Sequence, residues 1–264
     1  MAEPQESHAT ASKTRWAKVG GTVLFFGAIA FFVGGDPSPV ASQRAGASTV
    51  GPVRLPAAAE STPPVAPEGR LLHDAVNARI TGGAAYAQGN FDQARADYEA
   101  AVSANPEDAE ARNNLAQVLM RQNLPSVALP HFDEAVRVDP GKWAFRFNRA
   151  RAYAETNRLR DAADEYQAAA KLFPEDYATH YNLGLTQIKL KQYPEAVGAL
   201  EQAVQLAPGE PSFLITLGTA YVATQNPARA KATFEQFLQQ APDDPEAPRV
   251  RELLTALDAS NPGI

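Results

Sequence analysis

The sequence predicts an all-α protein in which an N-terminal transmembrane helix and a Pro-rich linker precede a right-handed α-solenoid of five helix pairs and a C-terminal capping helix. Three observations predict this architecture. Prolines recur at intervals of 34 residues, alanines recur in the same register, and an uncharged apolar run near the N-terminus precedes a proline-rich segment. A fixed period of this length is typical of stacked helical hairpins. An apolar run of this kind is typical of a membrane span.

Composition limits the classes of activity. The 264 residues include 24 Lys and Arg, 30 Asp and Glu, and no Cys. The absence of Cys excludes thiolate nucleophiles, Cys-ligated zinc, iron–sulfur clusters and disulfides. Residues 71–264 hold 18 basic and 25 acidic residues. This mildly acidic balance predicts no nucleic-acid partner.

The N-terminal part of the chain predicts a single membrane anchor. A polar basic tail, residues 1–18, precedes 17 uncharged residues at 19–35. At about 1.5 Å per residue the run covers roughly 25 Å, and the side chain of Lys18 extends the span toward the lipid head groups. Basic residues before the run and Asp36 after it predict a cytoplasmic N-terminus, with the rest of the chain on the trans side, periplasmic if the cell is bacterial. A cleaved secretory signal is the alternative, and it places the remainder on the same side.

Residues 36–70 are predicted to form a disordered linker. They contain seven prolines among Ala, Ser, Gly and Thr, and few of their side chains suit a core. At about 3.1 Å per residue in a polyproline conformation, the linker reaches on the order of 100 Å. We therefore expect the following domain to stand well away from the bilayer.

The C-terminal part, residues 71–260, consists of a repeated unit. The repeated prolines are Pro106, Pro140, Pro174, Pro208 and Pro242. The repeated alanines are Ala94, Ala128, Ala162, Ala196 and Ala230. Four residues after each alanine comes a large side chain, in order Tyr98, Phe132, Tyr166, Leu200 and Phe234. This stripe predicts a helix that ends shortly before the proline.

A first helix precedes this second helix in every unit. It carries a small residue that allows close helix packing, in order Gly82, Ala116, Ala150, Gly184 and Gly218. Short breaks separate the two helices at 88–90, 122–125, 156–158, 191–192 and 225–227. One helix pair cannot bury both of its faces, so successive pairs must stack. The predicted units are 75–108, 109–142, 143–176, 177–210 and 211–244, and an amphipathic stretch at 245–258 predicts the capping helix.

This pattern resembles a tetratricopeptide repeat array. The fourth unit is nearest the family pattern, through residues 180–184, 193–196 and 206–208. The departures from it are Thr81, Ala85, Arg149 and Phe237. The resemblance implies a protein-binding scaffold whose concave surface is made mainly by the first helices.

The sequence predicts no catalytic, metal-binding or cofactor-binding residues, and no enzymatic activity. The four histidines are far apart, without metal-ligand spacing. His131, near Asp133 and Glu134, is interpreted as a surface or partly packed residue on a second helix rather than a ligand. The Gly-Lys pair at 141–142 is not followed by Ser or Thr, so it does not form a phosphate-binding loop.

The candidate binding residues lie on the first helices. Asn114, Asn148 and Asn182 recur at 34-residue spacing, and an amide offers the donor and the acceptor that hold a peptide main chain. The resemblance implies that such an asparagine contacts the ligand backbone; the alternative is that it bonds to neighbours within the array. By the family pattern, the other groove residues are Arg79, Asn113, Gln117, Arg121, Phe147, Arg151, Tyr181, Leu185, Ile188, Lys189 and Ile215.

These groove residues predict a ligand segment that is acidic toward the first three units and apolar toward the last two. The residues at 144, 147 and 148 do not match the carboxylate clamp of chaperone-binding relatives. We expect a membrane-tethered adaptor that binds a protein segment and assists assembly of envelope or membrane-associated complexes. The alternatives are a homo-oligomeric structural protein, and an accessory subunit of a membrane enzyme or of a cytochrome c maturation complex.

Overall fold

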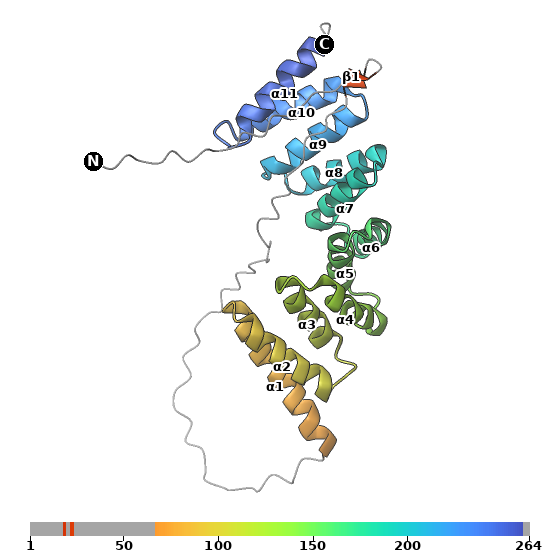
Figure 1. Ribbon diagram of the computed structural model, residues 1–264, viewed down its shortest axis with the longest axis vertical. Coiled ribbons are helices and arrows are strands. Elements are labelled where there is room, and N and C mark those ends of the chain that lie inside the picture. Colours follow the sequence, from red (N-terminus) through yellow and green to blue (C-terminus); the bar gives the residue numbers. More distant parts are fainter. Residues whose placement is uncertain (1–17, 20–21, 24–66, 261–264) are drawn as a thin grey trace, which may run out of the picture. The chain divides into compact units, whose positions relative to one another are not determined.

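The computed structural model describes residues 18–19, 22–23 and 67–260 of the chain. The last range is entirely helices and short turns (Figure 1). The helices are α1 (Pro67–Ala87), α2 (Phe91–Ala104), α3 (Ala109–Arg121), α4 (Pro125–Val138), α5 (Trp143–Glu155), α6 (Leu159–Leu172), α7 (Tyr177–Lys189), α8 (Tyr193–Leu206), α9 (Pro211–Ala223), α10 (Pro227–Gln240) and α11 (Ala247–Ser260).

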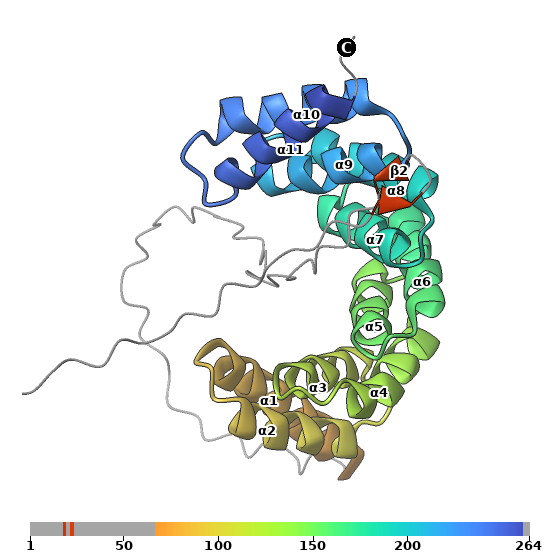
Figure 2. The same ribbon diagram turned by 45° about the horizontal axis from the view of Figure 1, so that its top comes forward.

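Consecutive helices pack as antiparallel pairs, and each pair packs on the next along the chain. The odd-numbered helices α3, α5, α7 and α9 lie on the inner side of the curve and their even-numbered partners on the outer side (Figure 2). Contacts between α1 and α3, between α3 and α5, and between α7 and α9 make the inner side continuous between those units. Helix α11 packs on α10 at the end of the array. The predicted array of five helix pairs and a terminal helix is therefore confirmed.

The core follows the repeated stripe of the second helices. The five alanines are fully buried, as are the four-residue-later side chains of units two to five: Phe132, Tyr166, Leu200 and Phe234. Tyr98 of the first unit is 4% exposed. Phe237, which replaces the small residue in the last unit, is also fully buried, in a cluster with Ala247 and Val250 of α11. The capping helix therefore covers the larger side chain.

The small residue of each first helix makes room for the large residue of its partner. A Cβ atom added to Gly184 would lie 2.6 Å from Leu200 Cγ, and one added to Gly82 would lie 3.0 Å from the Tyr98 ring. A real Cβ atom does not approach carbon so closely without a shift. The expected close packing is therefore seen between a glycine backbone and a facing side chain.

Each turn inside a helix pair contains one residue with left-handed backbone, again at 34-residue spacing. These residues are Gly89, Asn123, Asn157, Lys191 and Gln225, with φ between 58° and 75°. In each case the next residue donates its N–H to a carbonyl five residues back, as Leu124 does to Leu119 at 2.9 Å. This is the hydrogen bond of a Schellman motif, which ends the first helix. The predicted breaks therefore hold a defined helix stop.

Helix α1 begins at Pro67, earlier than expected. It takes in the last four residues of the predicted linker 36–70 and extends ahead of the predicted unit 75–108. Proline suits the first position of a helix because its missing N–H has no intrahelical partner there. The residues that follow it contain no further proline before α2, so the helix runs on without a break.

The N-terminal residues form a separate unit, Met1–Ala59. In it, β1 (Lys18–Val19) pairs antiparallel with β2 (Thr22–Val23). The remainder of the predicted anchor at 19–35, the tail at 1–17 and linker residues 36–66 lie outside the described residues. Within the described ranges, no helix combines the length and the apolar character that a membrane span requires.

Candidate functional site

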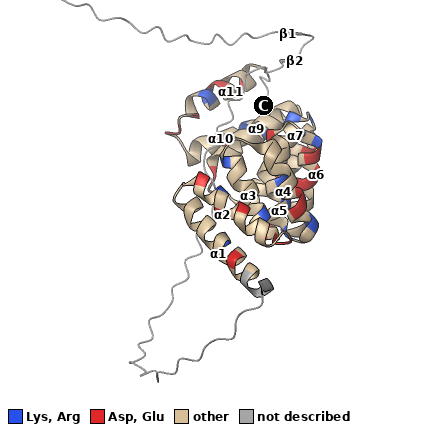
Figure 3. Ribbon diagram, turned by 60° about the horizontal axis from the view of Figure 1, so that its bottom comes forward, with Lys and Arg blue, Asp and Glu red and all other residues tan. Residues whose placement is uncertain are grey.

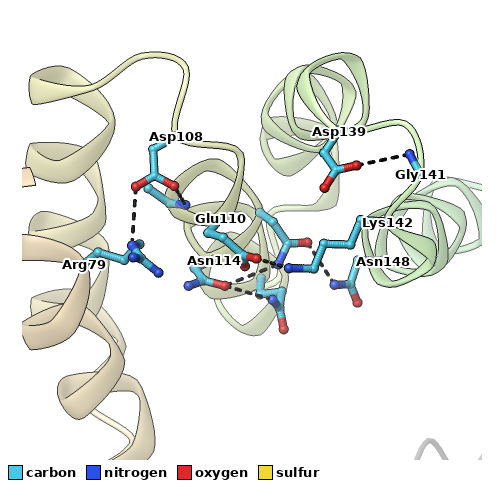
Figure 4. A network of polar contacts seen from close by, with 11 residues as sticks. Arg79, Asp108, Glu110, Asn114, Asp139, Gly141, Lys142 and Asn148 are labelled. Carbon is cyan, nitrogen blue, oxygen red and sulfur yellow. Dashed lines mark hydrogen bonds and ion pairs between the residues drawn. The ribbon is translucent and has the colours of Figure 1, made fainter. Parts of the chain in front are cut away.

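Four amide side chains meet on the inner side of the second and third units (Figure 4). Asn148 Nδ2 on α5 donates to Asn113 Oδ1 on α3 at 2.9 Å, and Asn113 Nδ2 donates to Asn114 Oδ1 at 3.3 Å. Gln117 Nε2 donates to the same oxygen of Asn114 at 3.4 Å. The structure therefore brings together four of the predicted site residues and links two repeats through their amides.

Burial decides how these amides are used. Asn113 is 5% exposed, and a buried amide requires hydrogen-bond partners, which it finds in its two neighbours. Asn114, Gln117 and Asn148 are only partly buried. Among the described residues, Asn148 Oδ1 and Gln117 Oε1 have no hydrogen-bond partner. These two oxygens are acceptors available for a bound main chain.

Asn182 does not continue this cluster. Its Nδ2 donates to Ala178 O, one turn earlier on the same helix, at 2.8 Å. The neighbouring residue, Tyr181, stacks on Phe213 with ring centroids 4.2 Å apart and pairs its hydroxyl with Thr216 Oγ1 at 3.2 Å. The equal spacing of the three asparagines therefore does not give them equal surroundings.

Ion pairs occupy much of the polar surface between the first three units. Arg79 Nε lies 3.4 Å from Asp108 Oδ2, and Asp108 also caps α3 by accepting from Ala111 N at 2.9 Å. Lys142 pairs with Glu110 across the next junction (Figure 4). Figure 3 shows Lys and Arg interspersed with Asp and Glu over α4–α7. The predicted groove residue Arg79 is thus engaged within the array.

The predicted apolar groove residues contribute mainly to packing. Phe147 contacts Tyr166 edge-to-face at 5.7 Å between ring centroids. Tyr181, Ile188 and Ile215 are partly buried against the core of the last two units. Leu185 is partly buried and Lys189 is exposed. The rims of these side chains remain as the apolar part of the inner surface.

Two apolar groove residues were missed by the sequence analysis. Val76 and Ile80 on α1 are 43% and 63% exposed. They lie 34 residues before Glu110 and Asn114, so the repeat register was the signal that could have found them. The expectation that the first three units present only polar and basic residues is therefore wrong for the first unit.

His131 lies partly buried on the outer helix α4, and its Nδ1 has no hydrogen-bond partner there. Burial lowers the pKa of His131, and the charge of Arg112 lowers it further. In the described part of the chain, no group of three His, Asp or Glu side chains has the geometry to hold a metal ion.

Comparison with known proteins agrees with this architecture. One tetratricopeptide repeat family model matches residues 82–142, 115–175 and 147–211, and a second matches 183–255. No curated protein sequence matches the chain.

Several solved structures are similar. The chain is 22% identical to MamA, with a TM-score of 0.61, over 67% of this chain and 95% of MamA. YrrB, described as a TPR protein with an unusual peptide-binding site, is 15% identical, with a TM-score of 0.62, over 71% and 98%. PilF of Pseudomonas aeruginosa is 19% identical, with a TM-score of 0.59, over 74% and 95%. At these identities the likeness concerns the fold. Since the family models together cover residues 82–255, the chain belongs to the tetratricopeptide repeat family.

Proposed function

We propose that this protein is a membrane-tethered adaptor that binds an extended protein segment along the inner side of its helix pairs. The observation that carries the proposal is the amide cluster of Asn113, Asn114, Gln117 and Asn148, which leaves acceptor oxygens open beside a continuous helical surface. Amide groups bind a peptide main chain without reading its sequence. The peptide-binding site described for YrrB supports the use of this fold for such a ligand.

The two ends of the inner surface would hold different parts of the segment. Val76 and Ile80 offer apolar contact in the first unit, and Leu185 and Ile188 offer it in the fourth. The amides lie between them. We therefore expect a segment with apolar residues at both ends and a polar centre, which corrects the simpler gradient expected from sequence.

The tether is the apolar run at 19–35, with a cytoplasmic N-terminus and the repeats on the trans side. The positively charged tail before the run supports this orientation. An adaptor held there by a long linker would gather partners near the membrane, and we propose assembly of envelope or membrane-associated complexes as its task.

Photo-cross-linking in the source cells tests the binding surface. The full chain carries a photoreactive amino acid in place of Gln117, or in place of Gln167, which is exposed on outer helix α6. We expect a discrete partner adduct from position 117 that is weakened by Asn148→Ala. Adducts of equal yield from both positions would exclude the inner surface as the binding site.

Self-association is a second candidate function, because α1 exposes a group of large apolar side chains. Leu71, Leu72, Val76 and Ile80 are 53%, 54%, 43% and 63% exposed. A cluster of this kind is typical of an interaction surface. Light scattering across a hundredfold range of protein concentration tests it, and a constant monomer mass would exclude it.

A further inference from the structure

Two hydrogen-bond donors converge near the junction of the first two units. Tyr86 lies near the C-terminal end of α1, and Arg121 is the last residue of α3. Arg121 Nε donates to the Tyr86 hydroxyl oxygen at 3.1 Å. The Tyr86 hydroxyl accepts this bond, and its own hydrogen has no acceptor among the described residues.

Arg151 brings a second guanidinium to the same place. It lies on α5, 34 residues after Gln117, and α5 contacts α3. Its charge acts on the Tyr86 hydroxyl: burial raises the pKa of Tyr86, and Arg151 opposes that rise. Within residues 71–260, Arg151 makes no hydrogen bond or ion pair, although Glu155 one turn further along α5 is close enough to feel its charge.

The three side chains therefore present more donors than acceptors. A guanidinium carries five N–H donors and no acceptor, and the hydroxyl hydrogen of Tyr86 adds another. A carboxylate is the complementary group, since it only accepts hydrogen bonds and binds guanidinium in a bidentate manner. We propose that Tyr86, Arg121 and Arg151 form a subsite for an acidic side chain of the bound segment. This inference rests on the proposed function and names one feature of its ligand.

The local charge favours a singly charged group over a phosphate. Glu155 offsets one of the two arginines, so the subsite holds one excess positive charge. The open oxygens of Gln117 and Asn148 lie on the same two helices, α3 and α5, as the arginines. A segment that pairs its main chain with these amides would thus place one Asp or Glu side chain at Arg151.

Fluorescence anisotropy on the full chain in detergent tests the subsite. The probe is a labelled hexapeptide of glutamate with an amidated C-terminus, and the glutamine hexapeptide is its uncharged match. We expect the glutamate probe to bind more tightly than the glutamine probe, and Arg151→Ala to weaken glutamate binding about tenfold, the effect of losing a charge-assisted hydrogen bond. Tyr86→Phe should weaken it about threefold.

Arg160→Ala is the matched control, because Arg160 is exposed on outer helix α6 and removes the same charge. Equal loss in the Arg151 and Arg160 variants, unchanged binding by Arg151→Ala with an unchanged melting temperature, or no preference for glutamate over glutamine would each overturn the subsite. Tighter binding of a serine-phosphorylated probe, or of a neutral peptide with a free C-terminus, would also overturn it in favour of that anion. The cross-link from position 117 reports the proposed function separately, since it does not depend on Arg151.

Discussion

Arg149 Nη2 lies 2.6 Å from Glu165 Oε1, at the place where the repeat pattern expects an apolar side chain. The same guanidinium reaches Asp133 Oδ1 of the preceding unit at 3.1 Å, and Arg146 lies 3.3 Å from the other oxygen of Glu165. The side chains of Arg149 and Glu165 are 15% and 16% exposed. An ion-pair network thus joins the second and third units where apolar packing would otherwise do so.

Removing one partner of this network should cost more than removing both. Glu165→Gln leaves a partly buried guanidinium underpaired, and we expect a loss of about 2 kcal/mol in the free energy of unfolding. The double variant Arg149→Leu, Glu165→Leu should lose less than the sum of the two single variants. Urea unfolding in a double-mutant cycle measures this coupling, and strictly additive losses would contradict it.

Adding a methyl group at Gly184 should destabilise the fourth unit. The new Cβ atom would meet Leu200 Cγ at 2.6 Å, so Gly184→Ala is expected to lower the free energy of unfolding by about 1–3 kcal/mol. Gly198 on α8 has nothing within 4 Å of an added Cβ. Gly198→Ala should therefore be neutral or stabilising by up to about 1 kcal/mol, because alanine favours the helix. Thermal unfolding of the two variants checks the difference, and a shared effect would refute the explanation by overlap.

Relieving a left-handed backbone should stabilise the protein. Lys191 has φ 61°, a conformation that costs an ordinary L-residue about 1–2 kcal/mol and costs glycine nothing comparable. Lys191→Gly is expected to raise the free energy of unfolding by about 0.5–1 kcal/mol after the greater chain entropy of unfolded glycine is counted. Lys191→Ala, which removes the charge and keeps the strain, should give no gain. A gain of equal size in both variants would assign the effect to charge.

Acid should weaken the fold in part through His131. Its pKa in the folded protein lies below the ordinary value, so the unfolded chain binds a proton that the folded chain resists. The contribution is fully present above about pH 6.5 and is lost as the pH falls toward the folded pKa. We expect His131→Gln to lose less stability than the wild-type protein between pH 7 and pH 5. Urea unfolding at both pH values measures this, with exposed His73→Gln as the control that should follow the wild-type protein.

The repeated residues carried most of the fold in the sequence. Alanine and a large side chain four residues later define one helical face, and only a partner helix with a small residue can cover it. Because this requirement repeats every 34 residues, the helix pairs, their turns and the stacking direction follow from the chain alone. The start of α1 was less predictable, since a proline both ends a linker and begins a helix equally well.

The binding surface was only partly predictable. The repeat register correctly placed Asn114 and Asn148 on neighbouring inner helices, yet it could not tell that Asn113 would be buried and joined to both by hydrogen bonds. Nor could it tell that Asn182, in the same register, would bond to its own helix. Register fixes which face a side chain takes, because helix geometry is local. Hydrogen-bond partners depend on the side chains of the next unit, which differ in every repeat, so only the tertiary structure decided which groups remain open to a ligand.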